Sequence, residues 1–186
     1  MSVKSKKFVL AATLYLVPIF AAAQGRTQDS DWRATLSHEL PLLGHRNWIA
    51  IVDSAYPLQT SPGIETIDTY SDHLEVVRMV LDQLARSKHV RPVIFIDREL
   101  QAIPETEATG VTAYRKSLSS LLAKTQPQSL PHEEIISKLD EAGKTFHILV
   151  LKSTLTIPYT SVFIRLDCGY WTAEQEKRLR ERMAKQ

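Results

Sequence analysis

The chain has 186 residues, of which 44% are hydrophobic and 24% charged, and it contains a single cysteine. This length suits one domain whose core is large enough to be stable without a metal or a disulfide. One cysteine excludes a disulfide framework within the chain. The composition also excludes disordered, collagen-like and coiled-coil proteins.

The first 23 residues have the pattern of a secretory signal peptide. Three lysines precede an apolar run over residues 8–20, and Ala21-Ala22-Ala23 follows before Gln24. The run is shorter than the ~20 apolar residues of a membrane-spanning helix, and Pro18 interrupts it. An uncleaved anchor and a buried helix of the domain are the alternatives. We expect residues 1–23 to be removed and the mature protein to be exported, either to the periplasm or out of the cell, with no membrane association after cleavage.

The net charge argues against nucleic-acid binding. The formal charge of +2 includes three lysines of the signal segment, which has no acid, so the rest of the chain carries 20 bases against 21 acids. A nearly neutral body lacks the basic surface by which nucleic-acid-binding domains are recognised. A short polar leader, residues 24–31, is predicted to precede the domain at 32–186.

Predicted helices and strands alternate along this domain. Apolar residues at helical spacing predict a first helix from Trp32 to Leu43, which Gly44 ends as a C′ glycine. A buried strand at 48–52 follows and stops at Asp53. The remaining predicted elements are a turn-rich stretch at 56–71, a helix opened by Asp72 and Glu75, a strand at 92–97, helices at 112–124 and 132–142, strands at 146–151 and 161–166, and a helix at 172–185.

This alternation predicts a single α/β domain with a mostly parallel sheet flanked by helices. Ligands of such sheets bind beyond the carboxyl ends of the strands, and Asp53 and Asp97 each stand at the end of a predicted strand. On the last helix we expect Leu179 and Met183 to pack inward, with the basic residues in solvent.

The sequence lacks the best-known catalytic motifs. It has no G-x-S-x-G, G-x-G-x-x-G, P-loop or H-E-x-x-H pattern, and its six histidines do not fall at the i, i+4 spacing of metal ligands. Cys168 has no neighbouring base in the sequence and is interpreted as a small, inert residue. We therefore expect neither a metal nor a cofactor.

Several segments together resemble the D-ribose pyranase and L-fucose mutarotase family. Leu43-Gly44-His45, an apolar strand and then Asp53-Ser54-Ala55-Tyr56-Pro57 are similar to the family's opening signature. Pro158-Tyr159-Thr160-Ser161 and the apolar run after it are similar to the second signature, with Ser161 in place of the family's asparagine. His132 stands near the position of a functional histidine in the ribose branch. The resemblance covers residues 32–170 in a consistent order.

The resemblance implies the same fold and a sugar mutarotase or pyranase, an isomerase that interconverts anomers or ring forms of a monosaccharide without a cofactor. One group takes the proton of the anomeric hydroxyl and another protonates the ring oxygen, a task that suits histidine, whose ordinary pKa is ~6.5. By the matching positions, His45 is the acid/base catalyst and Asp53 orients it or holds sugar hydroxyls. His132, Tyr159 and Ser161 bind the substrate.

One geometric difficulty concerns His45 and Asp53, which flank the first strand. They lie ~25 Å apart if the chain between them is fully extended, because a strand rises ~3.3 Å per residue. Either the chain bends near Gly44, or the site forms where subunits meet. The family's ring-shaped homo-oligomers, with sites between neighbouring subunits, imply the second solution.

Other interpretations remain open. A non-catalytic, exported carbohydrate-binding protein on the same scaffold is favoured by Ser161 and by the export signal. A structural or partner-binding protein that uses the ring and the C-terminal helix is a third. Taken singly, His45 is also typical of a polar residue at a helix end, Asp53 of a turn and Tyr159 of a packed ring.

Overall fold

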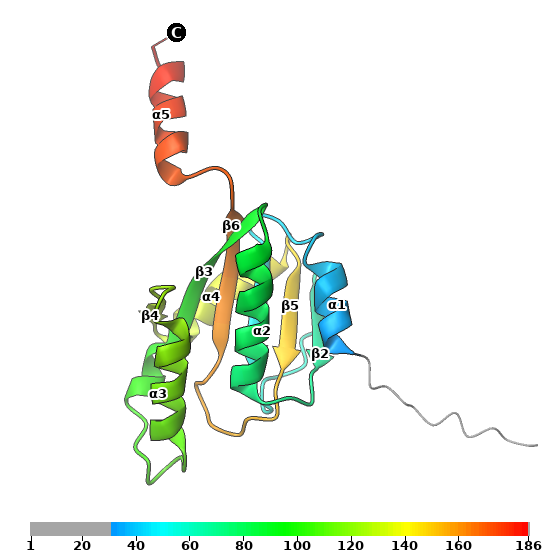
Figure 1. Ribbon diagram of the computed structural model, residues 1–186, viewed down its shortest axis with the longest axis vertical. Helices are drawn as coiled ribbons and strands as arrows, with labels where there is room; N and C mark the ends of the chain where they lie inside the picture. The colour runs from blue at the N-terminus through cyan, green and yellow to red at the C-terminus, as the bar shows by residue number, and fades with distance from the viewer. Residues whose placement is uncertain (1–30, 186) are drawn as a thin grey trace, which may run out of the picture.

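The computed structural model describes residues 31–185 (Figure 1). The predicted signal peptide lies outside the described residues, as does all of the leader except Asp31. Within the described part of the chain, no helix has the combination of length and hydrophobicity that a membrane span requires.

A six-stranded mixed sheet forms the centre of the domain, in the order β2-β5-β1-β6-β3-β4. Five strands share one direction, and β6 runs antiparallel between β1 and β3. The predicted α/β domain with a mostly parallel sheet is confirmed. The strands are β1 (Trp48–Val52), β2 (Ile64–Asp68), β3 (Val90–Asp97), β4 (Gln128–Leu130), β5 (Ile148–Lys152) and β6 (Val162–Cys168).

Helices cover both faces of this sheet (Figure 1). Ile49 and Ile51 of β1 pack into the core beneath the first three helices, whereas Trp48, Ala50 and Val52 pack into the core beneath α4. A strand buried on both faces has no apolar alternation, which explains its continuous apolar run. The helices are α1 (Trp32–Glu39), α2 (His73–Arg86) and α3 (Val111–Leu122) on one face, α4 (His132–Gly143) on the other, and the short 3-10 helix η1 (Arg98–Gln101) after β3.

The first helix ends earlier than predicted. α1 stops at Glu39, and Gly44 is not in the left-handed conformation of a C′ glycine. Pro41 gives the reason, because it has no N–H to continue the helical hydrogen bonds and restricts the residue before it. Gly44 instead donates its N–H to Asn47 Oδ1 at 2.7 Å.

The stretch at 56–71, predicted as turns, contains the edge strand β2. Its residues are half-buried, and Glu65 and Thr66 give it the composition of a loop. β4 is only three residues long and largely exposed. Short, polar edge strands leave little hydrophobic pattern in a sequence, so both were missed.

The prediction that Leu179 and Met183 pack inward is wrong. The last helix, α5 (Ala173–Met183), has no buried residue, and Met183 is 54% exposed. Figure 1 shows α5 extending away from the body of the domain. Its amino end nevertheless has the predicted capping box between Thr172 and Gln175.

Candidate functional site

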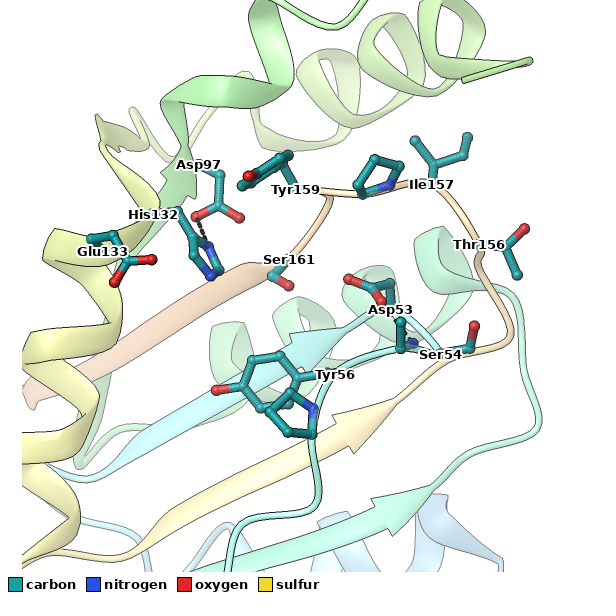
Figure 2. Close-up of a pocket in the computed structure, with 13 residues that line it drawn as sticks. Asp53, Ser54, Tyr56, Asp97, His132, Glu133, Thr156, Ile157, Tyr159 and Ser161 are labelled. Carbon is teal, nitrogen blue, oxygen red and sulfur yellow. Dashed lines mark hydrogen bonds and ion pairs between the residues drawn. The ribbon is translucent and has the colours of Figure 1, made fainter. Parts of the chain in front are cut away.

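A cleft of about 570 Å³ opens at the carboxyl ends of β1 and β3 (Figure 2). Four segments that are distant in the sequence line it: the turn after β1, the last residue of β3, the first turn of α4 and the loop before β6. The lining residues are Asp53 to Pro57, Asp97, His132, Glu133, Thr156 to Tyr159, and Ser161.

The turn after β1 is held by its own side chain and by the neighbouring loop. Asp53 Oδ1 accepts a hydrogen bond from the N–H of Ala55 at 2.8 Å, which is the pattern of an Asx turn. The N–H of Ser54 donates to the carbonyl of Leu155 at 2.9 Å. These bonds fix the two loops that face each other across the cleft.

A buried acid lies against a histidine at the centre of the site. Asp97 is fully buried, and its Oδ1 lies 3.1 Å from Nδ1 of His132, whose side chain is 28% exposed. Within the described residues, neither Asp97 oxygen accepts a well-aligned hydrogen bond. Burial raises the pKa of Asp97 to about 6, although the neighbouring His132 acts in the opposite direction. Because Nδ1 faces Asp97, Nε2 is the nitrogen left for a ligand.

His132 is positioned by the start of α4. Its backbone N–H lies 3.1 Å from both carboxylate oxygens of Glu99, which supplies the cap that Pro131 cannot provide. Its ring packs edge-to-face against Tyr159, with centroids 5.4 Å apart. Tyr159 has a φ of 56°, in the left-handed region, so the turn that carries it is held in an uncommon conformation.

A buried polar cluster anchors this loop from behind. The Tyr114 hydroxyl donates to the carbonyl oxygen of Thr160 at 2.8 Å and lies 3.1 Å from Nδ1 of His73. His73 Nε2 lies 3.4 Å from the carbonyl oxygen of Ile51. Burial lowers the pKa of His73 to about 4, so the ring is neutral at neutral pH. Nothing in the sequence pattern distinguishes His73, which begins an apolar helix face.

Tyr56 reports the electrostatic character of the cleft. It is 7% exposed, and burial raises its pKa to about 12, with further increases from Asp140, Asp97 and Asp53. Negative charge near a phenol opposes its ionisation. Several carboxylates therefore lie close to Tyr56 at this cleft.

His45 lies at the opposite end of β1 from the cleft. Its Nδ1 is 2.9 Å from Asp167 Oδ1, and Arg91 contacts the other oxygen of Asp167 at 2.6 Å. Partial burial opposes ionisation of Asp167, but the N–H of Cys168 and the charges of Arg91 and His45 hold its pKa below the ordinary value. The His45 side chain is 53% exposed, so it is open to a second molecule.

The structure thus brings four of the five predicted site residues together and leaves one apart. Asp53, His132, Tyr159 and Ser161 line the cleft, whereas His45 does not. Asp97 joins the four, and its signal in the sequence was its place at the end of a strand.

One group of possible metal ligands occurs among residues 31–185. The ligand atoms of Glu39, Glu65 and His147 lie within 4.8 Å of one another, and none of the three lines the cleft. The side chains of Glu65 and His147 are 44% and 33% exposed, and His147 Nε2 lies 3.7 Å from Glu65 Oε2. The expectation that the protein uses no metal or cofactor stays a prediction.

Comparisons with known proteins identify the fold. Neither a scan against protein-family models nor a search of curated proteins finds a match to this sequence. Among solved structures, RbsD of Bacillus subtilis, in complex with D-ribose, has a TM-score of 0.51 at 18% identity, covering 75% of this chain and 94% of that chain. The predicted ribose pyranase/fucose mutarotase-like fold is thereby confirmed as a fold.

Two further solved structures are similar at lower scores. FucU of Bifidobacterium longum has a TM-score of 0.49 at 12% identity and covers 71% of this chain and 92% of that chain. The fucose mutarotase of Streptococcus pneumoniae, in complex with L-fucose, has a TM-score of 0.44 at 16% identity and covers 70% and 89%.

Proposed function

We propose that this protein is an exported member of the ribose pyranase and fucose mutarotase family that interconverts anomers or ring forms of a monosaccharide. The observation that supports it best is the cleft itself. Asp53, His132, Tyr159 and Ser161 come from three separate segments of the chain and line one cavity, on a fold shared with a protein solved with D-ribose. The cavity volume of about 570 Å³ is sufficient for a monosaccharide.

The chemistry centres on His132. Its contact with Asp97 favours the tautomer with the proton on Nδ1, which leaves Nε2 as a base toward the ligand. Nε2 takes the proton of the anomeric hydroxyl, and the ring C–O bond breaks as a second group protonates the ring oxygen. Bond rotation and reclosure then give the other anomer or the other ring size.

The other residues hold the sugar in position. The Asp53 carboxylate accepts hydrogen bonds from sugar hydroxyls, and the ring of Tyr159 offers an apolar face. Ser161 makes a shorter polar contact than the asparagine of the family. His45, in this proposal, is the second acid/base group and comes from a neighbouring subunit of a ring-shaped homo-oligomer, because it lies far from the cleft of its own chain.

Exchange NMR on the mature protein tests the activity. We expect ribose or fucose, or another monosaccharide of a panel, to interconvert faster with the protein, and His132→Ala to remove the acceleration. His38→Ala is the matched control, because His38 is an exposed histidine on α1 outside the cleft. Equal acceleration by wild type and His132→Ala would show that the reaction does not use this cleft.

A non-catalytic carbohydrate-binding protein is the second candidate. It is favoured by the absence of His45 from the cleft and by Ser161 in place of a longer side chain. In the same experiment it predicts chemical-shift changes on sugar addition without faster exchange. If no monosaccharide causes chemical-shift changes or faster exchange, both candidates are contradicted.

Export is tested separately on the native host protein. We expect the chain to be recovered outside the cytoplasm with its amino terminus near Gln24. A cytoplasmic protein that keeps Met1 would contradict this part of the proposal.

A further inference from the structure

The charged side chains that line the cleft are almost all of one sign. Three carboxylates line it, those of Asp53, Asp97 and Glu133, and the lining drawn in Figure 2 includes no lysine or arginine. The ammonium of Lys152 donates to the backbone carbonyl of Tyr56 at 2.9 Å and does not line the cleft.

This excess of negative side chains matters most at the buried carboxylate of Asp97. It is fully buried and faces the cavity, and its Oδ1 lies 3.1 Å from Nδ1 of His132 without a well-aligned hydrogen bond among the described residues. A charge that water cannot screen acts strongly on any ligand beside it. Burial raises the pKa of Tyr56 to about 12, and the neighbouring carboxylates of Asp140, Asp97 and Asp53 act in the same direction.

We propose that the cleft selects sugars by charge, binding amino sugars more tightly than their neutral parents and rejecting uronic acids. This inference rests on the proposed function, because it takes the ligand to be a monosaccharide. The protonated amine of an amino sugar meets carboxylates in the cleft, whereas the carboxylate of a uronic acid is repelled by them and finds no lysine or arginine in the lining.

Two positions in the cleft contribute differently. Asp97 lies in the interior and is shielded from salt, whereas Glu133 lies in the exposed first turn of α4, at the rim. Salt screens exposed charges over ~10 Å or less at ordinary ionic strength. Added salt is therefore expected to weaken the contribution of Glu133 and to leave most of that of Asp97.

Isothermal titration of the mature protein at neutral pH tests the proposal with D-glucosamine, D-glucose and D-glucuronate, and with the corresponding galactose series. We expect the amino sugar to bind about fivefold more tightly than the neutral sugar, and the uronate about tenfold more weakly or not at all. Glu133→Gln should bring the affinities of the amino sugar and of the uronate closer to that of the neutral sugar. High salt should bring them closer still, to the difference that the buried Asp97 maintains.

The matched control is Glu134→Gln. Glu134 lies in the same first turn of α4 but outside the cleft, where it pairs with Lys138 at 3.3 Å, so it shares the helix and not the pocket. We expect its ratios to equal those of the wild type. If the neutral sugars bind and the amino sugars bind no more tightly than they do, charge selection is wrong and the proposed function still stands. No binding by any of the six sugars, nor by ribose or fucose, would overturn both.

Discussion

Asp97 and His73 are buried titratable residues near the same cleft, and their effects on stability oppose each other. Burial raises the pKa of Asp97 from 3.8 to about 6 and lowers the pKa of His73 from 6.5 to about 4. The Asp97 contribution to stability is present below about pH 4 and is lost as the pH rises through about 6. The His73 contribution is lost as the pH falls from about 6.5 to about 4. Between about pH 4 and 6, the contributions of these two residues to the stability of the wild type therefore have opposite signs and largely cancel each other.

Replacing Asp97 by asparagine is expected to stabilise the protein and to lower its activity. The substitution removes a charge that is costly to bury, so we expect a gain of about 1–3 kcal/mol in the free energy of unfolding near pH 7.5 and little change near pH 4. Mutarotation should slow about tenfold or more, with a shifted pH–rate profile, because His132 loses the carboxylate that orients it. Urea unfolding at both pH values, with exchange NMR, measures both effects. A loss of stability near pH 7.5 would show that Asp97 is held by favourable contacts.

Replacing His73 by glutamine is expected to remove the pH dependence of stability that His73 causes. Below about pH 6.5 the wild-type His73 ring gains a proton when the protein unfolds, whereas glutamine does not. Between about pH 6.5 and 4, the free energy of unfolding of the variant should therefore fall by about 2–3 kcal/mol less than that of the wild type. The comparison uses the slope of stability against pH, which is insensitive to any constant packing loss in the variant. Parallel slopes for the two proteins would contradict a neutral, buried His73.

At the scale of elements, the sequence indicated where the site lies better than how it is built. Asp53 and Asp97 were predicted at the carboxyl ends of strands, and both line the cleft. The contact between Asp97 and His132 was not predictable, because it depends on how α4 packs against β3. The direction of β6 was also hidden, since a buried apolar run such as Val162 to Ile164 looks the same in a parallel and in an antiparallel strand.

The start of α4 links this architecture to the chemistry. Both oxygens of Glu99 lie 3.1 Å from the N–H of His132, at the positive end of the helix dipole. We expect Glu99→Gln to cost about 1 kcal/mol of stability and to speed hydrogen exchange at the His132 amide. Glu134→Gln, which removes a negative charge from the first turn of α4 itself and does not affect this contact, should leave that amide protected. Equal exchange rates in wild type and Glu99→Gln would show that Glu99 does not hold the helix start.

At the scale of the whole molecule, His45 lies apart from the cleft of its own chain. Sequence spacing already placed it at the other end of β1 from Asp53, and the structure keeps it there with Asp167. A head-to-tail contact between copies places one end of a molecule against the opposite end of the next and closes into a ring when the rotation permits. The proposed ring therefore requires that each active site use His45 of one copy and His132 of another.

Mixing two inactive variants tests this requirement. His45→Ala and His132→Ala should each be inactive alone, but hetero-oligomers co-expressed in equal amounts should regain about a quarter of the wild-type activity, the fraction of interfaces with both intact residues. Asp53→Ala mixed with His132→Ala is the matched control and should stay inactive, because both residues line the cleft of the same chain. Full activity of His45→Ala alone would remove His45 from the reaction. If the two inactive variants do not restore each other's activity, both histidines act within one subunit, which contradicts the shared site.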